Sequence, residues 1–347
     1  METRRIIKND GITTLQLISN TKSESEKISK LPSFYIKKTK DPKYTTPDSH
    51  INEFNILNLL SHSNIIKTYG YNYKDNGILL DFINGADMYE YLQTDPLLTE
   101  YKIYKIFKQI VLATHYCHEK NIVHRDIKLE NIMIDKNSKI ILLDFEYAYL
   151  MESREDKLSV ENISGTVDYF PPELLRYIKP VVKDGKEKYA LIDQINGHVY
   201  NPFKLDIWSL GTILYELIFH CTPKIMTMTG DNNYKFCYWK GKKNYELKTL
   251  IKGMLMINPN DRYDTNDILN SEWIKKFDKI DKKIKKNIFN SYKESLILIK
   301  NNNYYEIDYK ILKEKNVTLN YLLASSEQNI EKLIKNDFKF SPNCIIS

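Results

Sequence analysis

Three oxygen-bearing side chains, Asp126, Asn131 and Asp144, lie close to one another in the middle of the chain. The apolar runs 132–134 and 140–143 between them predict a short β-hairpin, with the three side chains on the loops beside it. Mg²⁺ prefers a few carboxylate or amide oxygens together with phosphate oxygens. We therefore expect Asn131 and Asp144 to share a divalent cation, while Asp126 stays free to accept a proton. This combination suits phosphoryl transfer from a nucleotide, in which positioning and charge neutralisation supply most of the catalysis.

The same stretch carries two short motifs. The first reads His-Arg-Asp at 124–126, followed by Asn131, and the second reads Asp-Phe-Glu at 144–146. They resemble the His-Arg-Asp…Asn and Asp-Phe-Gly motifs of the eukaryotic-type protein kinases. Glu146 stands where that family carries glycine. A lone His-Arg-Asp is a weak signal, so the identification depends on further motifs that follow in the expected order.

The resemblance implies a role for each residue of this stretch. Asp126 would accept or orient the proton of the acceptor hydroxyl, and Lys128 would stabilise charge on the transferring phosphoryl group. Asn131 and Asp144 would bind Mg²⁺, with Mn²⁺ as an alternative. An Asp-x-Lys sequence here is typical of serine/threonine kinases. Glu146 either adds a metal ligand or repels phosphates, and we expect it to stiffen the loop with Asp144 still in place.

Residues 12–40 are interpreted as strands. Runs at 12–18 and 34–37 predict two of them, and the polar segment 19–26 between them is interpreted as the loop that covers the nucleotide. Kinases carry glycines in this loop so that backbone N–H groups can approach the phosphates. The segment 19–26 contains no glycine. The sequence therefore predicts a looser cover, or weakened nucleotide binding.

The second strand resembles the family's V-A-I-K strand, which makes Lys37 the candidate for the α- and β-phosphates. Glu53, in the amphipathic helix expected over 51–60, is the predicted ion-pair partner of Lys37. Lys38 is the alternative, because the register of a short strand is hard to fix. Tyr35 would then take the place of a small alanine beside the adenine, where a ring crowds the base.

Residues 78–87 resemble the strand and hinge that join the two lobes of a kinase. Backbone groups from Asp81 to Ile83 would bind the adenine edge. Asp87 would accept from a ribose hydroxyl or cap the following helix, and both roles are compatible. Met133 would lie beneath the adenine, or simply form part of the core. Together with Lys37 and Glu53, these residues make up the expected ATP site.

The segment 164–173 resembles the end of the family's activation segment, and Thr166 within it favours serine or threonine acceptors. Many kinases carry a phosphorylated threonine four positions earlier, whose charge pairs with the arginine of His-Arg-Asp. Asparagine occupies that position here. We therefore expect Arg125 to be engaged by Glu161 or by a phosphate on Ser159.

Two later motifs resemble structural elements of the family. In the first, at 204–211, Asp206 would hold the backbone of the catalytic loop. In the second, at 258–262, Arg262 would pair with Glu173. The 33 positions from Glu173 to Asp206 exceed the family's usual spacing, so 179–197 is interpreted as a surface insertion.

Composition narrows the class of protein. The 347 residues are 42% hydrophobic and 28% charged, which is ordinary globular usage. The net charge of +6 is modest and mixed along the chain, which argues against nucleic-acid binding. The four cysteines form no C-x-x-C pair, which argues against zinc and against a disulfide framework. With no signal or membrane-spanning segment evident, we expect an intracellular, cytoplasmic protein.

The predicted fold is α+β and bilobal, as the resemblance implies. A kinase domain over 1–277 would comprise a β-rich N-lobe at 1–82 and a mostly helical C-lobe at 88–277. Residues 278–347 would be an extension whose role the sequence does not indicate. The oligomeric state is likewise left open.

The predicted function is transfer of the ATP γ-phosphate to serine or threonine hydroxyls of a protein substrate. One alternative is a pseudokinase that binds or scaffolds, which the glycine-free loop, Tyr35 and Glu146 favour. The complete set of five expected site residues opposes it, because a scaffold has no chemical need for all of them: Lys37, Glu53, Asp126, Asn131 and Asp144. A kinase acting on small molecules is less favoured, because 164–173 resembles a peptide-docking platform.

Overall fold

The computed structural model describes residues 4–10, 13–19, 32–41, 47–95, 98–183, 186–192, 197–223, 245–300 and 303–308. The chain divides into two compact units, residues 1–275 and 276–347. The second unit contains most of helix α8 (Glu272–Glu294) and the antiparallel hairpin of β15 (Ser295–Lys300) and β16 (Asn303–Asp308). The elements discussed below belong to the first unit.

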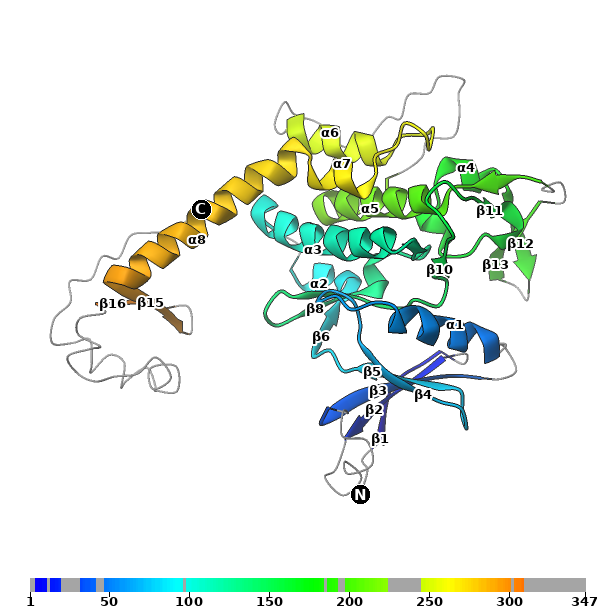
Figure 1. Ribbon diagram of the computed structural model, residues 1–347, viewed down its shortest axis with the longest axis horizontal. Coiled ribbons are helices and arrows are strands. Elements are labelled where there is room, and N and C mark those ends of the chain that lie inside the picture. The colour runs from blue at the N-terminus through cyan, green and yellow to red at the C-terminus, as the bar shows by residue number, and fades with distance from the viewer. Residues whose placement is uncertain are drawn as a thin grey trace. The chain divides into compact units, whose positions relative to one another are not determined.

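The amino-terminal lobe is a five-stranded antiparallel sheet with one helix against it (Figure 1). The strand order is β1-β2-β3-β5-β4, and helix α1 contacts β4 and β5. The elements are β1 (Arg4–Asn9), β2 (Thr13–Ser19), β3 (Phe34–Lys40), α1 (Pro47–Asn58), β4 (Thr68–Asn72) and β5 (Gly77–Asp81).

Strand β1 was not predicted, because its isoleucines, Ile6 and Ile7, are adjacent and both exposed, and so give no alternating pattern. It pairs with β2, and the Thr13 backbone N–H donates to Asp10 Oδ1 at 2.7 Å across the connection between the two strands. The connection between the first two strands is therefore 10–12, and it contains Gly11. The placement of the nucleotide loop at 19–26 was wrong, since that segment leads from β2 toward β3. Most of 19–26 lies outside the described residues.

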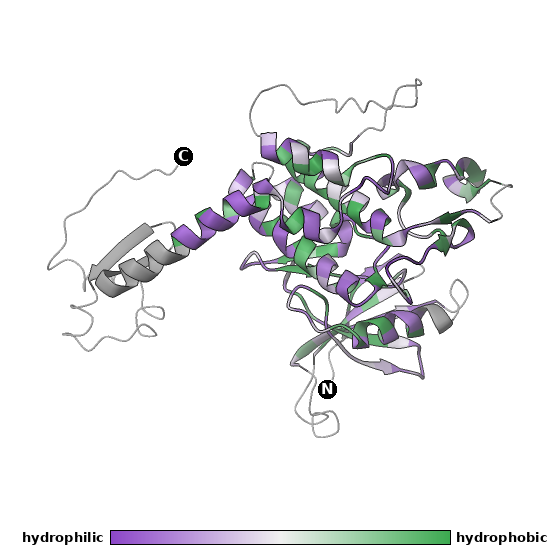
Figure 2. Ribbon diagram, turned by 45° about the horizontal axis from the view of Figure 1, so that its top comes forward, coloured by the Kyte–Doolittle hydropathy of each residue, from purple (hydrophilic) through white to green (hydrophobic). Residues whose placement is uncertain are grey.

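The larger lobe is mainly helical (Figure 1). Helix α3 packs against α5 and α7, and α5 is buried along nearly its whole length. Figure 2 shows hydrophobic residues gathered on the helices inside this lobe. The helices are α2 (Met88–Thr94), α3 (Glu100–Glu119), α4 (Pro172–Leu175), α5 (Pro202–Phe219), α6 (Tyr245–Met254) and α7 (Thr265–Leu269). The predicted bilobal α+β fold is confirmed.

A small sheet pairs a strand at the junction of the two lobes with two strands from farther along the chain. Its order is β6-β8-β9, formed by β6 (Gly85–Asp87), β8 (Ile132–Asp135) and β9 (Ile140–Leu142). The β8–β9 pair is the hairpin that the apolar runs predict. A Cβ atom on Gly85 would lie 2.0 Å from the carbonyl oxygen of Ile134. Glycine is therefore required at position 85 by the close approach of two strands.

The expected insertion contains a hairpin of β12 (Ile178–Lys183) and β13 (Lys186–Leu191). The chain then returns as β14 (Val199–Tyr200), which pairs with β11 (Leu158–Ser159) of the preceding segment. Tyr200 and Leu158 pack into one buried apolar cluster. The end of the insertion is thus joined to the segment that follows Asp144.

In the parts of the chain that the structure describes, no helix combines the length and apolar character needed to cross a membrane.

Candidate active site

The loop that carries the His-Arg-Asp motif, residues 124–131, is called the catalytic loop below. Its backbone is hydrogen-bonded to Asp206, a fully buried residue on α5. Its carboxylate accepts hydrogen bonds from the backbone N–H groups of His124, at 2.9 Å, and Arg125, at 2.8 Å. The ring Nε2 of His118 lies 2.9 Å from the same carboxylate. The predicted role of Asp206 is confirmed. These bonds fix a loop in which Arg125 adopts a left-handed φ of 66°, which is uncommon for a residue with a side chain.

The carboxylate of Asp126 is the centre of a polar cluster, and its side chain is buried. Asn131 Nδ2 donates to both the backbone oxygen and Oδ2 of Asp126, at 2.9 Å each. Lys128 Nζ lies 3.1 Å from Asp126 Oδ2. Thr166 Oγ1 donates to Asp126 Oδ1 at 2.7 Å and accepts from Lys128 Nζ at 2.7 Å. The structure thus brings together the predicted residues Asp126, Lys128 and Asn131.

The central ion pair of the smaller lobe is formed by Lys38. Its Nζ lies 3.0 and 2.8 Å from the carboxylate oxygens of Glu53 and donates to Asp144 Oδ1 at 2.7 Å. The predicted Lys37–Glu53 pair was wrong, and the alternative, Lys38, is the residue in contact with Glu53. Lys37 instead pairs with Asp75. The reason is strand alternation, which places adjacent side chains on opposite faces of β3.

Because Lys38, and not Lys37, faces Glu53, the expected register of β3 is displaced by one residue, and this changes the interpretation of Tyr35. Ile36 shares the face of Lys38, and lies directly opposite Leu80 of β5. Tyr35 lies on the other face, with Lys37. The predicted crowding of the adenine by Tyr35 was therefore wrong, and Ile36 takes the position beside the expected base.

The contact between Lys38 and Asp144 favours the ionised form of both side chains at neutral pH. Burial lowers the pKa of Lys38, but Glu53 and Asp144 outweigh burial and raise it above its ordinary value. Burial likewise raises the pKa of Asp144, but the neighbouring Lys38 ammonium lowers it to about 2. Because the folded-state pKa of Asp144 lies below its ordinary value, its stabilising contribution is present near neutral pH and is lost as the pH falls toward about 2.

The two predicted metal ligands present one amide and one carboxylate. Both hydrogen bonds of Asn131 Nδ2 go to Asp126, so its Oδ1 lies on the other side of the amide. Asp144 is 37% exposed at its side chain and has a left-handed φ of 59°. One carboxylate and one amide oxygen fit Mg²⁺ bound jointly with nucleotide phosphates.

The residues predicted to contact the nucleoside lie on β5, β6 and β8. Strand β5 ends at Asp81, and residues 82–84, including Ile83, lie outside the strands. Asp87 is directly opposite Met133 in the β6–β8 pair. Asp87 Oδ1 accepts from the backbone N–H of Glu90 at 2.8 Å, so its predicted helix-capping role is confirmed. Met133 is half-buried, between the buried Ile132 and Ile134.

Arg125 contacts backbone oxygens of the segment that follows Asp144. Its Nε donates to the carbonyl of Tyr147 at 2.6 Å, and its Nη1 donates to the carbonyl of Asn162 at 3.0 Å. The predicted pairing with Glu161 was wrong, because the 3-10 helix Val160–Asn162 leaves Glu161 exposed while its last carbonyl faces Arg125. Ser159 caps this helix by accepting from the N–H of Glu161 at 3.2 Å.

The Arg125 guanidinium donates its hydrogen bonds to main-chain carbonyls. Its position should therefore not change when the Glu161 carboxylate, or the hydroxyl of Ser159 that could carry a phosphate, is removed. We expect Ser159→Ala and Glu161→Gln each to change the rate of phosphate transfer by no more than about twofold, as for most surface substitutions. Initial rates at saturating ATP provide the measurement. A tenfold loss in either variant would contradict the main-chain account.

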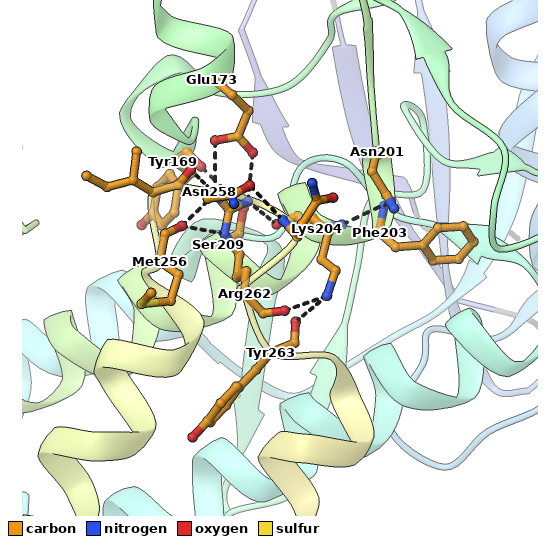
Figure 3. A network of polar contacts seen from close by, with 12 residues as sticks. Tyr169, Glu173, Asn201, Phe203, Lys204, Ser209, Met256, Asn258, Arg262 and Tyr263 are labelled. Atoms are coloured by element: carbon orange, nitrogen blue, oxygen red, sulfur yellow. Dashed lines mark hydrogen bonds and ion pairs between the residues drawn. The ribbon is translucent and has the colours of Figure 1, made fainter. Parts of the chain in front are cut away.

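The predicted pair between Arg262 and Glu173 is confirmed (Figure 3). Arg262 Nη1 and Nη2 contact the two carboxylate oxygens of Glu173 at 2.8 and 2.9 Å. The guanidinium also donates to the carbonyls of Met256 and Lys204, and lies 5.0 Å from the ring of Trp208. This network joins α4 to α5 and to the loop before α7.

Two contacts of the site were not predicted. Thr166 was singled out only for its acceptor preference, and its hydrogen bond to Asp126 depends on a contact between distant segments. Lys40 forms an ion pair with Glu146. The available signal was the spacing, since lysines at 38 and 40 share one face of a strand and carboxylates stand at 144 and 146.

Comparison with known proteins gives concordant results. The family profile described as "Protein kinase domain" matches residues 27–274. NUAK family SNF1-like kinase 1 of Mus musculus is 30% identical over 231 residues, which cover 64% of this chain and 31% of that protein. Serine/threonine-protein kinase KIN4 of Saccharomyces cerevisiae is 30% identical over 236 residues, which cover 64% of this chain and 27% of that protein. The Aurora kinase of Dictyostelium discoideum is 29% identical over 234 residues, which cover 65% of this chain and 53% of that protein.

The match of the family profile covers well over half of the chain and includes every element of the site. The chain spans about a third of the length of the first curated relatives it matches. The aligned region contains the motifs at 124–131 and 144–146, as well as the Arg262–Glu173 pair. The chain belongs to the protein kinase family.

Proposed function

We propose that the chain is a serine/threonine protein kinase, which transfers the γ-phosphate of ATP to hydroxyl groups of a protein substrate. The observation that carries this proposal is the linkage of Glu53 and Asp144 through Lys38. Glu53 is fully buried, so its charge requires a partner that the protein supplies. A scaffold has no chemical need for a lysine that joins a helix to the expected metal-binding loop.

Each residue has a defined task in this reaction. Lys38 binds the α- and β-phosphates, and the backbone from Asp81 to Ile83 binds the adenine edge. Asn131 and Asp144 hold Mg²⁺, which supplies charge neutralisation when bound, and Mn²⁺ is the alternative ion.

The acceptor hydroxyl is served by Asp126 and Lys128. Asp126 orients the hydroxyl and accepts its proton, a role that typically contributes about 10²–10⁴-fold in rate. Thr166 Oγ1 orients the Asp126 carboxylate, to which it donates at 2.7 Å. Lys128, 3.1 Å from that carboxylate, stabilises negative charge on the transferring group.

Two observations support serine and threonine as the acceptors. Lys128 and Thr166 are in direct contact beside Asp126, which is the arrangement that their motifs imply. The relatives include a protein named serine/threonine-protein kinase KIN4. Because the reaction consumes ATP, we place it inside the cell, in the cytoplasm.

The pseudokinase alternative loses part of its support. Tyr35 lies on the face of β3 away from Lys38, and Glu146 is paired with Lys40. The residues between the first two strands, 10–12, include Gly11. No feature of the described site favours a binding module without catalysis.

The extent of the catalytic domain is also a proposal. We assign residues 1–277 to it, with lobes at 1–82 and 88–277 and a surface insertion at 179–197, and we treat 278–347 as an extension. The family match ends at residue 274, and the first compact unit ends at residue 275.

The test is transfer of labelled γ-phosphate to a generic basic protein, with Mg²⁺ or Mn²⁺, followed by acid hydrolysis and identification of the labelled amino acid. We expect phosphoserine or phosphothreonine from the wild-type chain, and transfer near background from the Asp126→Ala variant. Equal labelling by both proteins, or label on tyrosine only, would contradict the proposal.

A further inference from the structure

Glu146 occupies the glycine position of the Asp-Phe-Gly motif and forms an ion pair with Lys40, the last residue of β3. The two side chains are only 20% and 4% exposed, so the pair is shielded from water. Lys38, two residues earlier on the same face of β3, pairs with Asp144. Two lysines at alternate positions of one strand therefore bind two carboxylates at alternate positions of one loop.

A third contact continues this pattern. Asn52 Nδ2, on α1 beside Glu53, donates to the backbone oxygen of Ala148 at 3.0 Å. Residues 144, 146 and 148 are thus each tied to the smaller lobe. Between them, Phe145 is fully buried and its ring lies 4.6 Å from that of His124 in the catalytic loop. The loop is fixed on one side by β3 and α1, and on the other side by the larger lobe.

The backbone of this loop needs such support. Asp144 has a left-handed φ of 59°, a conformation that residues with side chains rarely adopt. Sparsely populated conformations raise the energy of the chain and persist only where the surroundings enforce them. A glycine at 146 would leave the next turn of the loop free to vary. Glutamate removes that freedom and adds a charged contact.

The pairing also answers what the extra carboxylate does. A carboxylate beside the cation either binds it or repels the phosphates. Here Glu146 Oε1 is in contact with Lys40 Nζ, whose positive charge neutralises it. The geometry therefore favours a role in holding the loop over a role as a metal ligand.

We propose that Glu146 is a positioning residue, which uses its ion pair with Lys40 to keep Asp144 directed at the metal–nucleotide complex. The inference rests on the proposed function for the identity of that complex. It adds a second lysine–carboxylate link, parallel to the Lys38–Asp144 link, which the family motif lacks because glycine has no side chain.

The experiment measures nucleotide binding, so that it does not depend on phosphate transfer. Isothermal titration calorimetry on the full chain gives the Kd of a non-hydrolysable ATP analogue with Mg²⁺ and with EDTA. The ratio of the Kd in EDTA to the Kd with Mg²⁺ measures how much the metal strengthens nucleotide binding, and so reports how well the metal site is formed. We expect Glu146→Gln and Lys40→Met each to reduce this ratio about tenfold, within the range for directly coupled contacts. The Kd in EDTA should change by no more than about twofold.

Two further variants control the interpretation. The charge-reversed double variant K40E/E146K restores the pair with opposite polarity, and should bring the ratio back to within about threefold of wild type. Lys102→Met breaks the more exposed Lys102–Asp95 pair and should leave the ratio unchanged. Because Lys40 is buried, its variant is first checked for folding by circular dichroism, and Glu146→Gln tests the inference independently.

The outcomes separate the two proposals. If the ratio changes as expected in a chain that transfers no phosphate, the positioning role is supported and the proposed function fails. An unchanged ratio in Glu146→Gln would overturn the positioning role. A Kd ratio in K40E/E146K as low as in the single variants would also overturn it. So would a Kd ratio near one in the wild-type chain.

Discussion

Lys38→Met is expected to reduce phosphate transfer by about 10²–10³-fold, the range seen when one preorganised donor to a reacting group is removed. Lys38 Nζ is the cation that joins Glu53 to Asp144, at 2.8 and 2.7 Å. Its loss leaves both carboxylates without their ammonium partner and removes the contact expected for the α- and β-phosphates. The measurement is the initial rate of label transfer with Mg²⁺ and ATP.

The adjacent residue provides the matched control. Lys37→Met removes a side chain of the same type from the opposite face of β3, where its partner, Asp75, is 44% exposed. The Lys37 side chain is only 9% exposed, but methionine fills the space of its apolar stem and Asp75 can be hydrated once its partner is lost. We therefore expect Lys37→Met to transfer phosphate at close to the wild-type rate. Loss of activity in Lys37→Met with retention in Lys38→Met would restore the original prediction and contradict the register described here.

Arg262→Ala is expected to destabilise the domain by about 3–5 kcal/mol, as is typical when one partner of a buried ion pair is removed. The Arg262 side chain is fully buried, and Glu173 is 15% exposed. Removing the guanidinium leaves the Glu173 carboxylate uncompensated and also frees the carbonyls of Met256 and Lys204. Urea titration followed by circular dichroism gives the free energy of unfolding.

A surface pair supplies the comparison for this measurement. Arg154 Nη2 lies 2.6 Å from Glu119 Oε1, but both side chains are exposed. Arg154→Ala should therefore cost no more than about 1 kcal/mol. If the two alanine variants unfold at the same urea concentration, the buried pair is not what holds α4 against α5.

The sequence was most informative where function depends on short motifs in loops. Asp126, Asn131 and Asp144 stand at fixed distances from an apolar hairpin, so their convergence follows from the strand pattern. The Arg262–Glu173 pair and the support of the catalytic loop by Asp206 were also predicted. In each case both partners are charged or polar residues within recognisable motifs.

Strand register was not predictable to the same degree. The run Ile36-Lys37-Lys38-Thr39-Lys40 offers three lysines, and a displacement of one residue moves every side chain to the other face. That displacement reversed the assignments of Lys37 and Lys38 and removed the apparent clash of Tyr35. Pairing of Lys38 with Ile78 on β5 decides the register, and this is a long-range contact.

Main-chain partners leave no trace in the sequence. Arg125 was expected to meet an anionic side chain, but it binds the carbonyls of Tyr147 and Asn162. Every residue carries a carbonyl, so residue type cannot identify which one will be reached. Strand β1 was missed for a related reason, since its exposed isoleucines give no apolar alternation.

The central claim is that Asn131 and Asp144 hold the metal of a bound nucleotide while Lys38 contacts its phosphates. The most direct measurement is a crystal structure with Mn²⁺ and a non-hydrolysable ATP analogue, in which anomalous scattering locates the ion. The account predicts an anomalous peak between Asn131 Oδ1 and the Asp144 carboxylate, with Lys38 Nζ at the α- and β-phosphates. A nucleotide bound with its phosphates toward Lys37, or an ion bound away from Asp144, would contradict it.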